Sequence, residues 1–255
     1  MEIAKAIAKQ TLSNLGFHVD VVAETTGRRA DLLVRDESSS YLIEVKEKRD
    51  SPADVLNRKE CFESDEVYEQ VDPLSRDNRI SGILRDARKQ LTETPKENEA
   101  FQLIWFHASG VDSDLKFRQA FATFYGHVDL RAVQPPSAES VPCLYFDYSL
   151  AVDMPEIDAL ILLDKKHIQV CVNEFSHRIE DFRRTQLFRT FDELRGVFDP
   201  AQMINEKKCI ACRFELPRRD DRKICQALRE QTGVLYDSIR LNRYSFSALA
   251  KPAKD

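Results

Sequence analysis

Residues 29–48 read RADLLVRDESSSYLIEVKEK, and this stretch decides the fold that we predict. Segments 30–34 and 41–47 are rich in the apolar and β-branched residues that are typical of strands. The polar run at 35–40 between them has the composition of a turn. The stretch therefore predicts two neighbouring antiparallel strands.

Charged residues stand at particular positions in these two strands. Side chains alternate between the faces of a strand, so Glu44 and Lys46 share one face while Ile43 and Val45 share the other. Asp31, at the start of the first strand, delivers a second carboxylate beside them. Two carboxylates and an ammonium can hold a hard divalent cation and a water molecule, which together can hydrolyse a phosphodiester.

The segments on either side of these strands extend the pattern. Residues 2–15 predict an amphipathic helix, and residues 17–24 predict a strand that completes a three-strand meander. A second amphipathic helix is predicted over 79–91, and a buried strand over 101–108. The predicted order over residues 2–108 is therefore helix, three strands, helix, strand.

This order, with Asp31, Glu44 and Lys46 at those places, resembles the conserved core of the PD-(D/E)xK nuclease superfamily, to which restriction endonucleases and archaeal Holliday-junction resolvases belong. The motif of that superfamily has an aspartate at the start of the second strand and an acidic-x-lysine in the third. Ala30 stands where the motif has proline. The resemblance implies an α/β fold with a restriction-endonuclease-like core, and it leaves the C-terminal half of the chain without a family.

The resemblance also implies a metal cofactor and its ligands. Magnesium, or manganese, would bind the carboxylates of Asp31 and Glu44 together with the backbone carbonyl of Val45. The ion would lower the pKa of a bound water molecule, which Lys46 would orient or deprotonate. Two close carboxylates repel each other when no cation is present, so we expect one raised pKa at this site.

Further residues are expected near the site on the same grounds. In the superfamily an acidic residue of the first helix often joins the site, and Glu2 is the candidate for it; Glu24, at the end of the first predicted strand, is the alternative. A glutamine of the second helix recurs at the site in some branches, which makes Gln90 a candidate. Ordinary roles compete with these, because Glu2 also suits a helix dipole and Gln90 a helix edge. The basic residues that would contact phosphates, or else form solvated surface, are Arg28, Arg85, Arg88 and Lys89.

The composition limits the possible partners. With 42% apolar and 32% charged residues, the chain is expected to form a packed core with a charged surface. The net charge of −5 argues against general coating of nucleic acid, but it is compatible with an enzyme that binds nucleic acid along one local groove. No segment approaches the about 18 apolar residues that span a bilayer, and the N-terminus lacks a signal-peptide pattern. We therefore expect no membrane partner and a cytoplasmic location.

The predicted organisation has two parts. Residues 1–134 form the nuclease-like core, which an acidic insertion at 49–78 interrupts, and residues 135–255 form an α+β C-terminal extension of unknown role. The proline pair at 135–136 marks the boundary, unless strands on both sides of it join one sheet. The remaining expected elements are strands over 143–148, 158–164, 167–173, 207–216 and 234–241, and helices over 113–125, 177–195 and 220–231.

These observations favour a metal-dependent endonuclease that acts on DNA, in a restriction or phage-defence role. RNA stays open as a substrate because the phosphate chemistry is common to both nucleic acids. The alternative is a catalytically silent module of the same fold, which binds nucleic acid or assembles with a partner protein through the C-terminal region. A homodimer is implied by resemblance alone, since such nucleases often pair to cut both strands.

Overall fold

The chain is an α/β protein, and its computed structural model describes residues 2–22, 29–95 and 100–248. Within these residues the helices are α1 (Glu2–Asn14), α2 (Pro52–Glu63), α3 (Asn78–Glu93), α4 (Ser113–Tyr125), α5 (Leu150–Asp153), α6 (Ile179–Phe182), α7 (Gln186–Glu193), α8 (Pro200–Asn205) and α9 (Asp221–Thr232). The strands are β1 (His18–Val21), β2 (Leu32–Arg35), β3 (Ser40–Lys48), β4 (Tyr68–Pro73), β5 (Phe101–Ala108), β6 (Val128–Gln134), β7 (Pro136–Leu144), β8 (Ala159–Leu163), β9 (Ile168–Val172), β10 (Val197–Phe198), β11 (Ile210–Ala211), β12 (Leu235–Ile239) and β13 (Asn242–Ser247).

The largest sheet has seven strands in the order β1-β2-β3-β5-β8-β9-β10. Strands β1, β2 and β3 form the predicted antiparallel meander. Strands β3, β5 and β8 run parallel, so their carboxyl ends meet at one edge of the sheet. All residues of β5 except His107 are buried, as expected for a strand inside a sheet that is covered on both faces.

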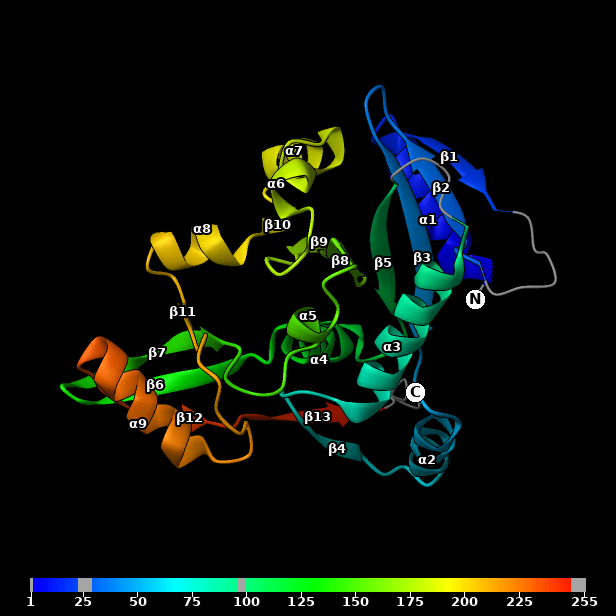
Figure 1. The fold of residues 1–255 in the computed structure, drawn as a ribbon. Coiled ribbons are helices and arrows are strands. Elements are labelled where there is room, and N and C mark those ends of the chain that lie inside the picture. Colours follow the sequence, from blue (N-terminus) through cyan, green and yellow to red (C-terminus); the bar gives the residue numbers. More distant parts are fainter. Residues whose placement is uncertain (1, 23–28, 96–99, 249–255) are drawn as a thin grey trace.

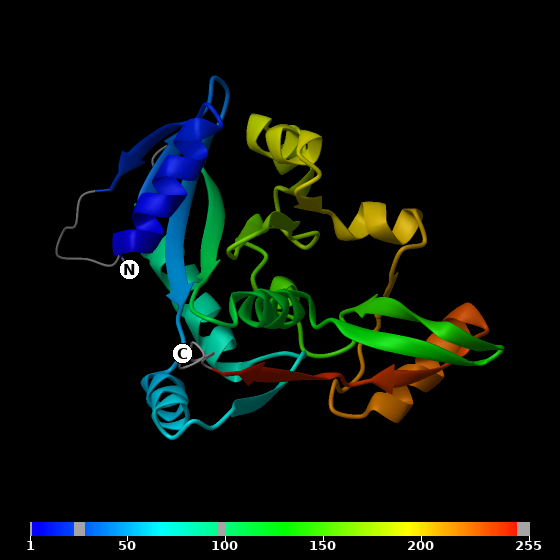
Figure 2. The same cartoon turned by 180° about the vertical axis from the view of Figure 1, so that it is seen from behind.

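Helices cover both faces of this sheet (Figure 1; Figure 2). The apolar stripe of α1, including Leu12, packs in one core with Trp105 of β5. Leu84 of α3 packs in the other core with Phe106, the next residue of β5, because successive strand residues point to opposite faces. In the described part of the chain, no helix has the length and apolarity that crossing a membrane requires.

Two smaller sheets complete the fold. The four strands β11-β7-β6-β12 form a layer against α9, at the opposite end of the molecule from β1 (Figure 1). Strand β4 pairs antiparallel with β13, the last described strand of the chain. The segment at 49–78, predicted as an acidic insertion, thus contains helix α2 and strand β4, and β4 ties it to the C-terminal part.

The proline pair at 135–136 lies within the β6–β7 hairpin. Strands β8, β9 and β10, which follow it, extend the sheet that β1, β2, β3 and β5 begin. Strands from both sides of the proline pair therefore join one sheet, which is the second of the two arrangements that the sequence allows. The predicted division between residues 134 and 135 falls inside paired structure.

Some predicted elements of the C-terminal half are wrong in extent. The single helix predicted over 177–195 is divided into α6 and α7, because Thr185 has an extended backbone and its hydroxyl accepts a hydrogen bond from the Phe188 amide at 3.2 Å. This is an N-cap, which begins a new helix. The strand predicted over 207–216 is limited to β11, whereas the residues that follow the proline pair form strand β7 from Pro136 onward and pair with β6.

Candidate active site

Asp31, Glu44 and Lys46 converge at the junction of β2 and β3, as the sequence pattern predicts. In the antiparallel register Leu32 pairs with Ile43, so Asp31 precedes β2 directly beside Glu44. The Asp31 amide donates to the Ile43 carbonyl at 3.0 Å, which continues the ladder to this position. Backbone pairing therefore fixes the separation of the two acidic residues.

The Asp31 carboxylate has two partners. Its Oδ2 accepts a hydrogen bond from the Val45 amide at 2.8 Å, and its Oδ1 lies 2.7 Å from the ammonium Nζ of Lys5. Lys5 belongs to α1, so this ion pair joins the helix to the start of β2. The side chain of Asp31 is 11% exposed.

Glu44 is the most deeply buried member of the group. Its side chain is 2% exposed, and burial together with the nearby Asp31 carboxylate raises its pKa to about 7. Its Oε1 lies 3.0 Å from Nζ of Lys46, which acts in the opposite direction on that pKa. Its Oε2 is buried and has no hydrogen-bond partner among the described residues. The raised pKa agrees with the expectation for two close carboxylates.

The Lys46 ammonium is held from several directions. Its Nζ lies 3.0 Å from Glu44 and 2.7 Å from Oδ2 of Asp86, and it donates a further hydrogen bond to Oε1 of Gln90. Burial alone would lower the pKa of Lys46, but the bonds to Asp86 and Glu44 outweigh it and raise the pKa. The structure thus brings Gln90 to the group, as predicted.

Lys5 and Asp86 also belong to the group, and the sequence analysis did not identify them. Asp86 lies one turn before Gln90 on α3, so the two side chains share a face of the helix. The same helical spacing that predicts Gln90 at the site therefore also predicts Asp86 there. Lys5 lies almost one turn after Glu2 on α1. A prediction restricted to acidic residues on that helix could not find it.

Of the residues predicted from the first helix and strand, the structure describes only Glu2, and it does not bring Glu2 to this group. Glu2 is exposed in the first turn of α1, and none of its described contacts reaches Asp31, Glu44 or Lys46. The side chain of α1 that reaches the group is therefore Lys5 and not an acidic residue. Glu24 and Arg28 lie outside the described residues.

The basic residues predicted on α3 differ in their surroundings. Arg88 forms an ion pair with Glu156, and Lys89 lies 3.8 Å from Glu93 one turn later. Arg85 is exposed. Two of the three cations are thus partly neutralised within the protein, which weakens the predicted phosphate-binding face.

The carboxylates of Asp31 and Glu44 would supply part of the coordination sphere of a bound magnesium ion. The buried, unpartnered Oε2 of Glu44 beside the Asp31 carboxylate fits the preference of magnesium for one or two carboxylates. Among the described residues, no three His, Cys, Asp or Glu side chains are arranged to hold a metal ion. A bound magnesium would therefore complete its coordination with the Val45 carbonyl, water and substrate phosphate oxygens.

An open depression of about 610 Å³ lies next to Lys46, between the carboxyl end of β3 and helix α3. Lys46 and Asp86 are the members of the group that line it. Its lining residues are Lys46, Glu47, Arg49, Arg79, Gly82, Ile83 and Asp86.

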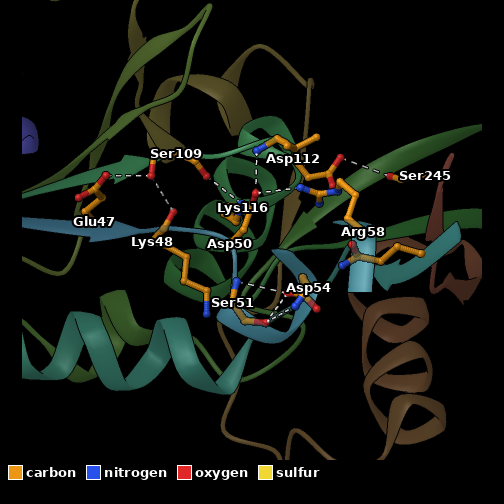
Figure 3. Close-up of polar contacts among 12 residues, drawn as sticks. Glu47, Lys48, Asp50, Ser51, Asp54, Arg58, Ser109, Asp112, Lys116 and Ser245 are labelled. Carbon is orange, nitrogen blue, oxygen red and sulfur yellow. Dashed lines mark hydrogen bonds and ion pairs between the residues drawn. The ribbon is translucent and has the colours of Figure 1, made fainter. Parts of the chain in front are cut away.

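A second polar cluster fixes the segment that follows β3 (Figure 3). The Asp50 carboxylate accepts hydrogen bonds from the Val111 amide at 3.1 Å and from the buried Lys116 ammonium, and Arg58 lies 3.4 Å away. Burial would raise the pKa of Asp50, but these bonds lower it overall. A side chain at Gly110 would collide with this carboxylate. The cluster therefore holds the carboxyl ends of β3 and β5 together.

The site thus consists of three carboxylates, two ammonium groups and the Gln90 amide between α1 and α3, with an open depression beside Lys46. The geometry follows from the β2–β3 register and from the face that α3 presents to β3. Comparisons with protein-family models, with curated proteins and with solved structures find no match to this chain.

Proposed function

We propose that this protein is a metal-dependent endonuclease that hydrolyses phosphodiester bonds in DNA. The observation that carries the proposal is the convergence of Asp31, Glu44 and Lys46, with an unpartnered carboxylate oxygen on Glu44. Carboxylate oxygens paired with an oriented ammonium suit a hydrated dication and a phosphate. The resemblance to the PD-(D/E)xK superfamily supports the same reading, and a restriction or defence role is part of the proposal.

Each residue has a distinct task in this proposal. Asp31 and Glu44 supply negative charge at one point, and the rigid β2–β3 ladder keeps their separation constant. Lys46, which Asp86 and Gln90 hold in place, orients the attacking water and stabilises the charge that develops on the phosphate. A bound magnesium ion would supply a water of lowered pKa and further neutralisation of the phosphate.

A cleavage assay tests the proposal. Purified protein is incubated with single-stranded, duplex and branched DNA and with RNA, with magnesium, with manganese, or with a chelator. We expect cleavage of DNA that needs the metal and that falls at least ~100-fold in Asp31→Asn and in Lys46→Met. Glu206→Gln, which alters an exposed ion pair with Lys208, is the matched control.

Circular dichroism and urea unfolding establish that each variant is folded. Cleavage at the wild-type rate by folded Asp31→Asn and Lys46→Met would show that another part of the chain, or a contaminant, carries the activity. Cleavage of RNA alone would leave the site in place and correct the substrate class.

A silent module of the same fold is the second candidate, and one observation favours it. Lys5 lies 2.7 Å from Asp31 and Lys46 lies 3.0 Å from Glu44, so each carboxylate already has an ammonium group beside it without a metal. Titration calorimetry separates the two readings. A nuclease takes up magnesium in the wild type and loses this uptake in Asp31→Asn, whereas a silent module gives no magnesium heat in either protein.

A further inference from the structure

Beyond the residues that would cleave the substrate, the depression beside Lys46 has the features of a surface for extended nucleic-acid backbone. We infer that phosphates next to the one at Lys46 bind Arg49 and Arg79, and that the strand crosses the bare backbone of α3 at Gly82. This inference rests on the proposed function for its reacting phosphate, but its own subject is binding, which can be measured without cleavage.

Gly82 is the first observation. It lies inside the 16-residue helix α3, is exposed, and lines the depression. A glycine inside a helix destabilises it relative to alanine. No packing requires glycine here, because a Cβ built at this position meets no atom within 4 Å, and the backbone does not adopt a positive φ. Glycine at this position allows a ligand to approach the helix backbone closely, which a larger side chain would prevent.

The two arginines are the second observation. Arg79 lies three residues before Gly82 on α3, is exposed, and forms no ion pair with the residues that the structure describes. Arg49 follows β3 on the other side of the depression and lies 2.7 Å from Glu47 with its side chain 58% exposed. A guanidinium presents several N–H donors in one plane, which suits phosphate oxygens.

The surroundings give the path a direction. A smaller cavity of about 130 Å³ adjoins the depression and shares Arg49 and Arg79 with it. Acids outnumber cations in the rest of that cavity, where Asp50, Asp54, Asp72, Asp77 and Asp112 stand against Lys48, Arg58 and Lys116. Burial and the nearby Asp112 and Asp54 raise the pKa of Asp72. This smaller and more acidic cavity suits a phosphate backbone less well than the depression does, so the strand runs along α3 past the arginines.

Cations outnumber acids in the lining of this depression, although the chain as a whole carries a net charge of −5. Lys46, Arg49 and Arg79 face it against Glu47 and Asp86. Such a local excess of cations favours the binding of a polyanion at this place.

Fluorescence anisotropy with a labelled DNA oligonucleotide of about 20 nucleotides, single-stranded or duplex, tests the inference in a chelator, where a metal-dependent enzyme does not cleave. Affinity is measured over a series of salt concentrations for the wild type, Arg79→Ala, Arg49→Gln and Arg79→Lys. Arg222→Ala is the matched control, since it removes one exposed arginine from α9.

We expect the slope of log affinity against log salt to fall by about 1 in Arg79→Ala and in Arg49→Gln, because each variant loses one phosphate contact. Arg79→Lys keeps the charge and should restore the slope. Arg222→Ala should retain the wild-type slope. A wild-type slope in Arg79→Ala, or no oligonucleotide binding by the wild type, would overturn the inference.

Gly82→Leu is a second, independent probe. A Cβ at this exposed position meets no atom within 4 Å and leucine favours the helix, so the variant should be at least as stable as the wild type in urea. It should nevertheless bind the oligonucleotide at least tenfold more weakly, because leucine fills the approach to the helix backbone. Wild-type affinity in this folded variant would contradict the inference.

These outcomes separate the inference from the proposed function. Binding that depends on Arg79 and Gly82 in a protein that never cleaves would sustain the inference and refute the nuclease proposal. Metal-dependent cleavage that requires Lys46, with affinity indifferent to Arg79 and Gly82, would sustain the proposal and refute the inference.

Discussion

Glu44 is the residue whose ionisation most directly reports on the site. Its pKa in the folded protein is about 7, against an ordinary value of 4.5, because burial and Asp31 disfavour its charged form. Between these two values the folded state binds more protons than the unfolded state. The free energy of unfolding should therefore fall as the pH rises through this window, by on the order of 2–3 kcal/mol from this group.

Urea unfolding in a chelator at about pH 5 and about pH 8 measures this effect. Glu44→Gln keeps the shape of the side chain and cannot ionise, so it should lose much less stability than the wild type over the same interval. All other titrating groups are common to both proteins, and the difference between the two profiles isolates Glu44. Parallel profiles would mean that Glu44 is charged throughout this range.

Asp50 shows how a single buried charge supports the site from a distance. Asp50→Asn would keep a hydrogen-bond acceptor for the Val111 amide but remove the counter-charge of Lys116, which is 7% exposed. Leaving a buried ammonium unpaired typically costs about 3–5 kcal/mol, and we expect a loss of unfolding free energy of about 3 kcal/mol. The exposed pair of Glu206 and Lys208 gives the contrast, since Glu206→Gln should leave the urea midpoint unchanged.

The residues of the site could be predicted from sequence only where a local pattern specifies them. Glu44 and Lys46 share a face because strand side chains alternate, and Asp31 stands beside them because a short turn sets the register of β2 against β3. Lys5 reaches the same point from a helix whose packing angle no local pattern records. The burial of Glu44, which raises its pKa, likewise depends on tertiary packing.

At the scale of an element, Gly82 of α3 has an ordinary helical backbone and room for a side chain, so its cost to helix stability can be measured. Gly82→Ala should raise the unfolding free energy by ~0.5–1 kcal/mol, because alanine favours the helix and its Cβ meets no neighbour. Gly16→Ala is the matched contrast, since a Cβ there also meets open space but the φ angle is +90°. That substitution should destabilise the protein. Equal effects of the two substitutions in urea unfolding would contradict this account.

Helices and strands with a strong hydrophobic periodicity could be predicted from the sequence, and those without it could not. Helix α3 and strands β3 and β5 have strong patterns, and the structure places them close to the predicted ranges. The break between α6 and α7 depends on the single N-cap Thr185, which an uninterrupted apolar stripe conceals. The polar residues that begin β7 form a strand because β6 offers them a partner, which composition alone cannot show.

At the scale of the whole molecule, the seven-stranded sheet joins both halves of the chain. Strand β5 lies between β3 and β8 in the sheet. In sequence, β5 is separated from β8 by α4, by the β6–β7 hairpin and by α5. Parallel pairing across such a crossover leaves no local signature, and for this reason the sequence could not decide between one sheet and two parts. The C-terminal half thus contributes β8, which pairs with β5, the neighbour of the site strand β3.

This arrangement predicts the behaviour of fragments. A fragment of residues 1–134 would expose the edge of β5 and the apolar faces that β8 and α7 cover, so it should aggregate or remain unfolded. The full chain should unfold in urea as one transition, seen alike by circular dichroism and by the fluorescence of Trp105. A soluble fragment with cooperative unfolding would instead support the division between residues 134 and 135.

The central claim is that the β2–β3 junction holds a phosphodiester-cleaving centre in which the Glu44 carboxylate is indispensable. The most direct measurement is the rate at which a supercoiled plasmid is nicked in magnesium by the wild type and by Glu44→Gln, each shown to be folded. We predict metal-dependent nicking by the wild type and a rate at least ~100-fold lower in the variant. Equal nicking rates, or a wild-type protein that nicks no plasmid in magnesium, would contradict the claim.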